Sequence, residues 1–406
     1  MILFWIFTGI TLFGIIGYLL QIIAVRSYTG SPHCGEGMCL PRSFSPVSIL
    51  KPLKGLDDGL FDNLESFCNL DYPQYEIIFA LQNQNDPAYK VVKKIKDKYP
   101  SNDLTIVVEH CNEGLNPKVN NLIPAYKRAK YDLILISDSN VRAEKDYLVD
   151  ISRHMDDPCV GLVSNMIRGV SGRSLGAVME NLHLNSFIVG SVCFLDKYLK
   201  MPCVVGKSML MRKAELNAIG GFRAVKDFLA EDYIIGKRIH GLGKKVVLSG
   251  HLINNVNEYW GVKRFINRHT RWGKLRWQIG GAKYFSELAG NAVFMSVMPM
   301  VVMPTSKVAL LMAATVSALK IVHDFYIGRK LRAEINPLLY LLSPVKDLII
   351  GFVWFVPIIS NTVAWRGNRY IIGKDSMLSP YPERGTTVRG LRIVTAIKTR
   401  LAWSKT

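Results

Sequence analysis

An uncharged N-terminal run constrains this chain more than any other feature of its sequence. Residues 1–25 contain no charged side chain, and Arg26 follows immediately. A helix of about 20 apolar residues crosses the hydrocarbon core of a bilayer, so this run is long enough to span one. A secretory signal would instead begin with a basic region and end in a small-residue cleavage site. We therefore predict an uncleaved transmembrane anchor over residues 1–26.

The chain is strongly basic, with a formal net charge of +19. Zinc-ligand spacings and aromatic single-strand-binding signatures, which usually accompany such charge in nucleic-acid-binding proteins, are missing from the sequence. Basic residues also collect on the cytosolic side of membrane proteins, where they favour anionic lipids and anionic substrates. We therefore predict a bilayer as a partner, no nucleic acid, and a basic cytosolic tail over residues 366–406.

The middle of the chain has the pattern of one folded domain. Residues 27–45 are rich in Gly, Ser and Pro and have no hydrophobic period, which predicts a linker. From Pro46 onward, short apolar runs alternate with segments of helical spacing, and this alternation predicts an α/β fold with a mainly parallel sheet. The expected strands are 47–50, 76–81, 104–109 and 132–136, and the expected helices are 60–68, 89–98 and 117–130.

Three apolar stretches near the C-terminus, 288–303, 308–327 and 337–363, predict further membrane helices within residues 286–365. Four prolines interrupt them, and charged side chains inside them are costly at the bilayer centre. The number of complete crossings stays open for that reason. The residues concerned are Pro299, Pro304, Pro344 and Pro357, together with Lys307, Lys320, Lys346 and Asp347.

Two acidic segments follow expected strands, at the edge where parallel sheets bind their ligands. Asp86 ends a polar loop after strand 76–81, although an Asp before Pro is also ordinary turn chemistry. Asp138 and Asn140 follow strand 132–136, and their period-two spacing places them on one side of an extended chain. Such oxygen ligands suit a hard divalent cation that also binds substrate phosphates. A turn or capping role is the alternative for both acids.

Glu231 and Asp232 stand just before a helical segment that ends at Gly241. Acids in a first helical turn are favoured by the helix dipole, so a structural role is the alternative to a catalytic one. A catalytic role requires an acceptor hydroxyl nearby.

The most specific motif is Arg268-His269-Thr270-Arg271-Trp272. On a helix, Arg268, Arg271 and Trp272 would project from one face. Two guanidinium groups beside an indole make a clamp for a diphosphate or a polar acceptor. The alternative is a basic juxtamembrane helix with a Trp at the interface.

Taken together, these segments resemble the ceramide glucosyltransferases and related membrane glycosyltransferases. The resemblance covers roughly residues 47–277 and rests on SILKPLKG at 48–55, DYP at 71–73, and NPKVNNL at 116–122. It implies a cytosolic catalytic domain of GT-A type over residues 46–280. Asp86, Asp138 and Asp232 match the three acids of that family, and residues 268–272 match its RxxRW motif.

The resemblance also implies a role for each matched residue. Asp232 would be the general base, and Asp138 with Asn140 would hold Mn or Mg against the diphosphate of a UDP-sugar, assisted by Arg271. Asp86, with Lys51 or Lys118 nearby, would position the uracil and ribose, and Trp272 would pack beside Arg268 at the acceptor entrance. Because no second carboxylate is identified as a nucleophile, we expect a single displacement with inversion.

We therefore predict transfer of glucose from UDP-glucose to ceramide, at the cytosolic face of a bacterial inner membrane or of a Golgi- or ER-type membrane. Three departures from the family leave the acceptor open. Asn140 stands where ceramide enzymes carry Gly, residues 185–189 lack an expected His, and Asn83 and Asn85 stand where acids are usual. The alternatives are transfer of N-acetylglucosamine or another sugar to a hopanoid or polyol lipid, a processive polysaccharide synthase, and a non-catalytic membrane scaffold.

Overall fold

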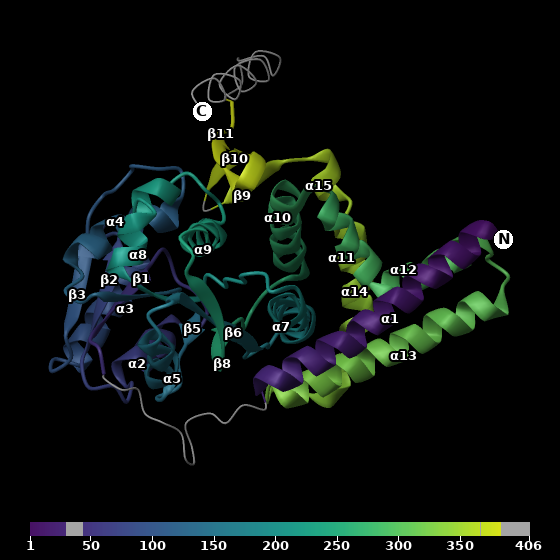
Figure 1. Cartoon of the computed structure of the whole chain (residues 1–406), viewed down its shortest axis with the longest axis horizontal. Coiled ribbons are helices and arrows are strands. Elements are labelled where there is room, and N and C mark those ends of the chain that lie inside the picture. Colours follow the sequence, from purple (N-terminus) through teal and green to yellow (C-terminus); the bar gives the residue numbers. More distant parts are fainter. Residues whose placement is uncertain (30–43, 366, 383–406) are drawn as a thin grey trace.

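A computed structural model describes residues 1–29, 44–365 and 367–382 of the chain (Figure 1). Most of the predicted linker and the end of the predicted tail lie outside these residues. The described part contains a sheet domain and a group of long helices, which lie on opposite sides of the molecule in Figure 1.

The domain is built on an eight-stranded mixed sheet with the strand order β3-β2-β1-β4-β7-β6-β8-β5. Its first half is parallel, and the antiparallel strand β7 joins it to the second half, where β6 and β8 pair in parallel. The predicted mainly parallel α/β fold is confirmed. The strands are β1 (Val47–Pro52), β2 (Tyr75–Leu81), β3 (Leu104–Val108), β4 (Leu133–Ser137), β5 (Val141–Arg142), β6 (Val160–Val170), β7 (Ser208–Arg212) and β8 (Lys245–Val256).

Helices cover both faces of this sheet because successive strand residues point to opposite sides. Ile49 belongs to one hydrophobic cluster and Leu50 to the other, and both are fully buried. Side-chain caps fix two helix starts, with Asp86 capping α3 and Asn116 capping α4. The helices are α2 (Leu60–Cys68), α3 (Pro87–Lys98), α4 (Pro117–Arg128), α5 (Tyr147–Ser152), α6 (Leu175–His183), α7 (Val189–Leu199), α8 (Lys213–Ala218), α9 (Glu231–Gly241) and α10 (Val262–Gly280).

Within the described residues, four helical segments are long and apolar enough to cross a membrane: Ile2–Thr29, Leu175–Leu199, Lys307–Lys330 and Pro337–Ile359. The first is α1, and the predicted anchor lies within it. Leu175–Leu199 is largely buried inside the protein and contacts the sheet. The remaining helices are α11 (Phe285–Gly290), α12 (Ala292–Val302), α13 (Lys307–Lys330), α14 (Ser343–Val353) and α15 (Val356–Ile359), and Figure 1 shows α1 beside α13.

Four charged side chains inside these apolar helices form one buried network. Lys320 lies 2.9 Å from Asp324 and 3.4 Å from Asp347, while Lys346 lies 2.5 Å from Asp347 and 3.7 Å from Asp324. Two cations and two anions therefore balance one another between α13 and α14. This pairing offsets the cost of burial, since charges inside membrane segments are tolerated when they pair with each other.

The chain after the last apolar helix differs from the predicted tail. Three short strands, β9 (Thr362–Trp365), β10 (Asn368–Ile372) and β11 (Leu378–Pro380), form an antiparallel sheet. Tyr370, Ile372 and Leu378 pack with Leu229, just ahead of α9. The basic composition hid these apolar positions, which alternate over only a few residues. The C-terminal sheet therefore packs against the sheet domain.

Candidate active site

Asp138 lies immediately after β4, between two lysine side chains. Lys118 Nζ is 2.8 Å from Asp138 Oδ1, and Lys207 Nζ is 3.0 Å from Asp138 Oδ2. Burial raises the pKa of the Asp138 carboxyl, but the attraction of the two ammonium groups outweighs it. The pKa therefore lies well below its ordinary value, and Asp138 is ionised at neutral pH.

Asn140 shares Lys207 with Asp138. The Lys207 ammonium donates to Asn140 Oδ1 at 2.6 Å, while Asn140 Nδ2 donates to Asn255 Oδ1 at 3.1 Å. Oxygens of Asp138 and Asn140 thus converge on one cation, here the ammonium of Lys207. A carboxylate and an amide oxygen arranged in this way also fit a divalent cation such as Mg²⁺, which completes its shell with water and phosphate oxygens.

Lys118 connects Asp138 to a second acidic segment at the start of α9. Its Nζ lies 2.9 Å from Glu231 Oε1 and donates to the Gly206 carbonyl oxygen at 3.0 Å. Glu231 also accepts a hydrogen bond from Asn116 Nδ2 at 2.9 Å. Four segments that are distant in sequence therefore meet around one ammonium group. They lie at residues 116–118, 138, 206 and 231.

Asp232 lies beside this group and is fixed by backbone donors. The Gly206 N–H donates to Asp232 Oδ2 at 2.9 Å, and the Tyr233 N–H donates to Oδ1 at 2.8 Å. A Cβ atom at position 206 would stand 2.4 Å from Asp232 Oδ2, so only glycine allows this approach. Burial and the negative charge of Glu231 raise the pKa of Asp232 to about 6. A carboxyl with such a pKa is suited to proton transfer near neutral pH.

The RxxRW segment lies on α10, where Arg268 and Trp272 are in contact as predicted from helical spacing. The Arg268 guanidinium carbon is 4.3 Å from the centre of the Trp272 ring. Arg268 Nε also lies 3.0 Å from Glu180, a buried carboxylate on α6, and His269 Nε2 lies 2.8 Å from the same carboxylate. Arg268 is therefore held by Glu180, and Arg271 is partly buried on the same helix.

The predicted neighbours of Asp86 lie elsewhere in the structure. Asp86 accepts hydrogen bonds from the backbone N–H groups of Gly55 and Ala88, each at 2.9 Å. Lys51 is fully buried, and its Nζ donates to Ser137 Oγ at 3.0 Å and to the Asp138 carbonyl oxygen at 3.1 Å. Lys51 thus supports the segment that carries Asp138, as Lys118 does.

Lys207 and Glu180 are the polar residues that sequence reasoning missed. Lys207 directly precedes β7 and follows the glycine that contacts Asp232, and a Gly-Lys pair at a strand start was the available signal. Glu180 lies in an apolar segment, where a single acid gives no sign of its partner. The two residues are linked electrostatically, because Lys207 and Arg268 repel each other while Glu180 holds Arg268.

A separate group of possible metal ligands lies beside the middle of β8. Ligand atoms of Glu144, Asp146 and His251 lie within 4.8 Å of one another. Glu144 is paired with Arg168 at 2.8 Å, and His251 Nδ1 lies 2.7 Å from Asp150. These interactions already engage two of the three side chains, so the group is adequately explained as a structural cluster.

Comparison with known proteins assigns the chain to a family. A family model described as "Glycosyl transferase family 21" matches residues 6–378. The chain belongs to glycosyl transferase family 21. The match contains all the acids described above and the RxxRW segment.

Curated relatives of this family 21 chain include two proteins of Caenorhabditis elegans. Ceramide glucosyltransferase 3 is 33% identical over 262 residues, which cover 64% of this chain and 56% of the relative. Ceramide glucosyltransferase 1 is 33% identical over 236 residues, which cover 57% and 49%. The chain therefore spans about half the length of the curated relatives it matches.

A solved structure shares the fold. The mannosyltransferase PcManGT from Pyrobaculum calidifontis, determined with GDP-Man and Mn²⁺, is 15% identical to this chain and has a TM-score of 0.54. The likeness covers 88% of this chain and 98% of that one. The predicted GT-A type fold is confirmed.

Proposed function

We propose that this chain transfers glucose from UDP-glucose to a membrane lipid, ceramide, with inversion at the anomeric carbon. One observation carries the proposal: the cation-binding oxygens of Asp138 and Asn140 are joined through Lys118 to the Glu231–Asp232 pair. In this arrangement, the group proposed to hold the diphosphate and the group proposed to accept the proton would lie on either side of one ammonium. The ceramide glucosyltransferase names of the relatives support the choice of substrates.

The leaving diphosphate needs positive charge and a rigid support. Asp138 and Asn140 would hold Mn²⁺ or Mg²⁺, which neutralises the charge developing on the diphosphate when it is bound. Lys118, which contacts the other oxygen of Asp138, would add positive charge at the same place. Arg271, on the helix that carries the RxxRW motif, would contact the diphosphate from the opposite side.

The nucleoside end of the donor would bind near Asp86. Its carboxylate is held by two backbone N–H groups, those of Gly55 and Ala88, so it is fixed before the donor arrives. We propose that Asp86 positions the uracil and ribose. The fully buried Lys51 would act indirectly, by holding the segment that carries Asp138.

Asp232 would act as the base. The acceptor hydroxyl oxygen bonds to the anomeric carbon as the bond from that carbon to UDP breaks, and UDP leaves with the electron pair. The hydroxyl proton passes to a carboxylate oxygen of Asp232, whose pKa of about 6 suits this transfer. A single displacement of this kind inverts the configuration of the anomeric carbon.

Transfer to a lipid fits the arrangement of the apolar helices. They would hold the domain against the bilayer, where a lipid hydroxyl lies at headgroup level while its chains stay in the membrane. The basic tail and Arg26 favour a cytosolic active site, because basic residues collect on that side. The domain boundaries at 26, 45, 280 and 365 stay predictions.

The test is sugar transfer by the full chain purified in detergent with Mn²⁺ or Mg²⁺. Wild type and Asp232→Asn are compared with UDP-glucose and UDP-N-acetylglucosamine as donors, and with ceramide and a hopanoid polyol as acceptors. Asp157→Asn, which changes an exposed acid paired with Lys245, serves as the matched control.

We expect glucosylceramide from wild type and from the control, and a loss of at least about a hundredfold in Asp232→Asn, the usual contribution of a positioned base. Transfer only to the hopanoid would keep the mechanism and change the acceptor. Long polymeric products would indicate a processive synthase. If no donor–acceptor pair showed either donor binding or sugar transfer, the scaffold alternative would be favoured.

A further inference from the structure

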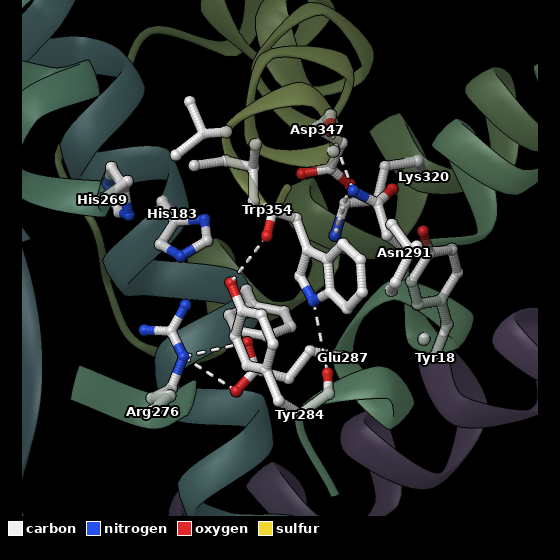
Figure 2. Close-up of a pocket in the computed structure, with 16 residues that line it drawn as sticks. Tyr18, His183, His269, Arg276, Tyr284, Glu287, Asn291, Lys320, Asp347 and Trp354 are labelled. Carbon is white, nitrogen blue, oxygen red and sulfur yellow. Dashed lines mark hydrogen bonds and ion pairs between the residues drawn. The ribbon is translucent and has the colours of Figure 1, made fainter. Parts of the chain in front are cut away.

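A pocket between α10 and the apolar helices contains polar groups that the proposed chemistry does not use. It is bounded by residues from α1, α6, α10, α11, α13 and α14. Figure 2 shows His183 in this pocket, between His269 on one side and the rings of Tyr284 and Trp354 on the other.

His183 is buried without a hydrogen-bond partner. Its side chain is 2% exposed, and among the described residues neither Nδ1 nor Nε2 has a partner. His269 Nδ1 likewise has none within the described part of the chain, although His269 Nε2 is held by Glu180. Burying a polar atom without a hydrogen bond costs about 1–3 kcal/mol, so such atoms facing a pocket indicate a polar ligand.

The opposite wall of the pocket is aromatic and rigid. The rings of Tyr284 and Trp354 are stacked, with centroids 4.9 Å apart and planes 7° from parallel. The Tyr284 hydroxyl donates to the Trp354 carbonyl oxygen, and Trp354 Nε1 donates to the Tyr284 carbonyl oxygen, each at 3.2 Å. Arg276 and Glu287 form an ion pair at 2.8 Å beside them. A wall of this kind suits the apolar stem of an amphipathic molecule.

His269 connects the pocket with the candidate active site. It belongs to the RxxRW segment and shares the buried carboxylate of Glu180 with Arg268. Arg268 in turn interacts electrostatically with Lys207, which contacts Asp138. One side of the pocket is thus formed by the helix that carries the RxxRW segment, and the other by helices apolar enough to enter a membrane.

We infer that this pocket binds the polar backbone of the acceptor lipid, the part that carries an amide and a hydroxyl below the reacting hydroxyl. The inference rests on the proposed lipid acceptor. A neutral imidazole has one donor and one acceptor nitrogen, so His183 and His269 match a ligand with both kinds of group. The hydrocarbon chains would leave past Trp354 and Tyr284 toward the apolar helices.

The first experiment locates the lipid without relying on transfer. The full chain in lipid nanodiscs is irradiated with a ceramide analogue that carries a diazirine next to its amide, with and without excess ceramide. We expect adducts on peptides from α10, α11 and α14 that excess ceramide suppresses. Adducts spread over the outer faces of α1 and α13, or adducts insensitive to ceramide, would overturn the inference.

The second experiment adds a side chain at the wall of the pocket. A Cβ atom at Gly290, which lines the pocket, would have no atom within 4 Å, so Gly290→Leu adds volume with little clash. Gly9 on α1 is equally open but does not line the pocket, which makes Gly9→Leu the matched control. We expect Gly290→Leu to lose the ceramide-suppressible adducts and Gly9→Leu to keep them. Equal labelling of both variants would overturn the inference.

The third experiment removes the unpartnered nitrogens of His183. Since they bond to no described protein atom, His183→Leu should unfold at a temperature no lower than wild type. We expect the KM for ceramide to rise on the order of tenfold, the effect of one lost hydrogen bond, with kcat and the KM for UDP-glucose within about twofold. His183→Asn, which can both donate and accept, should recover part of the loss.

These outcomes separate the inference from the proposed function. If the wild-type protein gave pocket adducts but transferred no sugar, the proposed function would be wrong and the lipid site would be supported. Normal transfer, together with an unchanged ceramide KM in both His183→Leu and Gly290→Leu, would support the function and overturn the site.

Discussion

Ser376 Oγ accepts a hydrogen bond from the backbone N–H of Ala230 at 3.2 Å, and its carbonyl oxygen accepts one from the N–H of Leu229 at 2.9 Å. Ala230 directly precedes Glu231 and Asp232. The C-terminal sheet, which follows all of the apolar helices in sequence, therefore holds the loop that presents the proposed base.

Ser376→Ala should loosen that loop. It leaves the buried N–H of Ala230 without its side-chain acceptor, which costs about 1–3 kcal/mol. We expect kcat to fall several-fold while the KM for UDP-glucose stays close to wild type. Ser379→Ala, in β11 of the same sheet, is the control. Steady-state kinetics check the prediction, and equal kcat values in the two variants would contradict it.

The rate should depend on pH through Asp232. Only the ionised carboxylate accepts a proton, and burial together with Glu231 raises its pKa to about 6. We therefore expect kcat/KM for the acceptor to be constant above that pH and to fall about tenfold per pH unit below it. Glu231→Gln removes the neighbouring negative charge and so should lower the pKa of Asp232. In this variant the decline of kcat/KM should therefore begin at a lower pH than in wild type. A decline of kcat/KM that begins at the same pH in both proteins would contradict this account.

Lys207 should compete with a divalent cation. Its ammonium occupies the position on which oxygens of Asp138 and Asn140 converge. We expect Lys207→Met to bind Mn²⁺ several-fold more tightly than wild type in a calorimetric titration without donor. Lys245→Met, a change at an exposed lysine, should bind as wild type does. Unchanged affinity in Lys207→Met would show that the cation binds elsewhere.

Glu180 should be important for stability. It is fully buried and pairs with both Arg268 and His269, so its loss leaves a buried guanidinium without its partner. Breaking a buried ion pair costs about 3–5 kcal/mol. We expect Glu180→Gln to lower the unfolding temperature by several degrees. Glu65→Gln, which breaks the exposed pair with Lys98, should change it little, and a similar effect of both would contradict the prediction.

Packing between α1 and α12 depends on a glycine. A Cβ atom at Gly14 would stand 2.8 Å from Ala292 Cβ, whereas one at Gly17 would have no atom within 4 Å. Small residues allow apolar helices to approach closely in membranes. Gly14→Leu should therefore reduce the yield of folded protein and lower its unfolding temperature, while Gly17→Leu should not. Size-exclusion profiles and thermal unfolding in detergent compare the two.

Local patterns were sufficient to predict the first half of the sheet domain. The expected strands 47–50, 76–81, 104–109 and 132–136 each coincide with a strand to within a few residues, because buried strands and capped helices leave their period in the sequence. Asp138 and Asn140 both contact Lys207, but residues 139–140 form a turn after β4, so the extended spacing expected from the sequence does not explain this contact. Helical spacing did place Arg268 against Trp272.

The environment of these residues was decided by the tertiary structure. Lys118 lies in sequence between Asp86 and Asp138, and only the folded chain shows that it contacts Asp138 and Glu231. Glu180 and Ser376 likewise act on residues more than 80 positions away. The sequence determined which segments become strands, helices and apolar spans, because those choices depend on neighbouring residues. Partners of buried charges depend on contacts between distant segments, which form only when the whole chain packs.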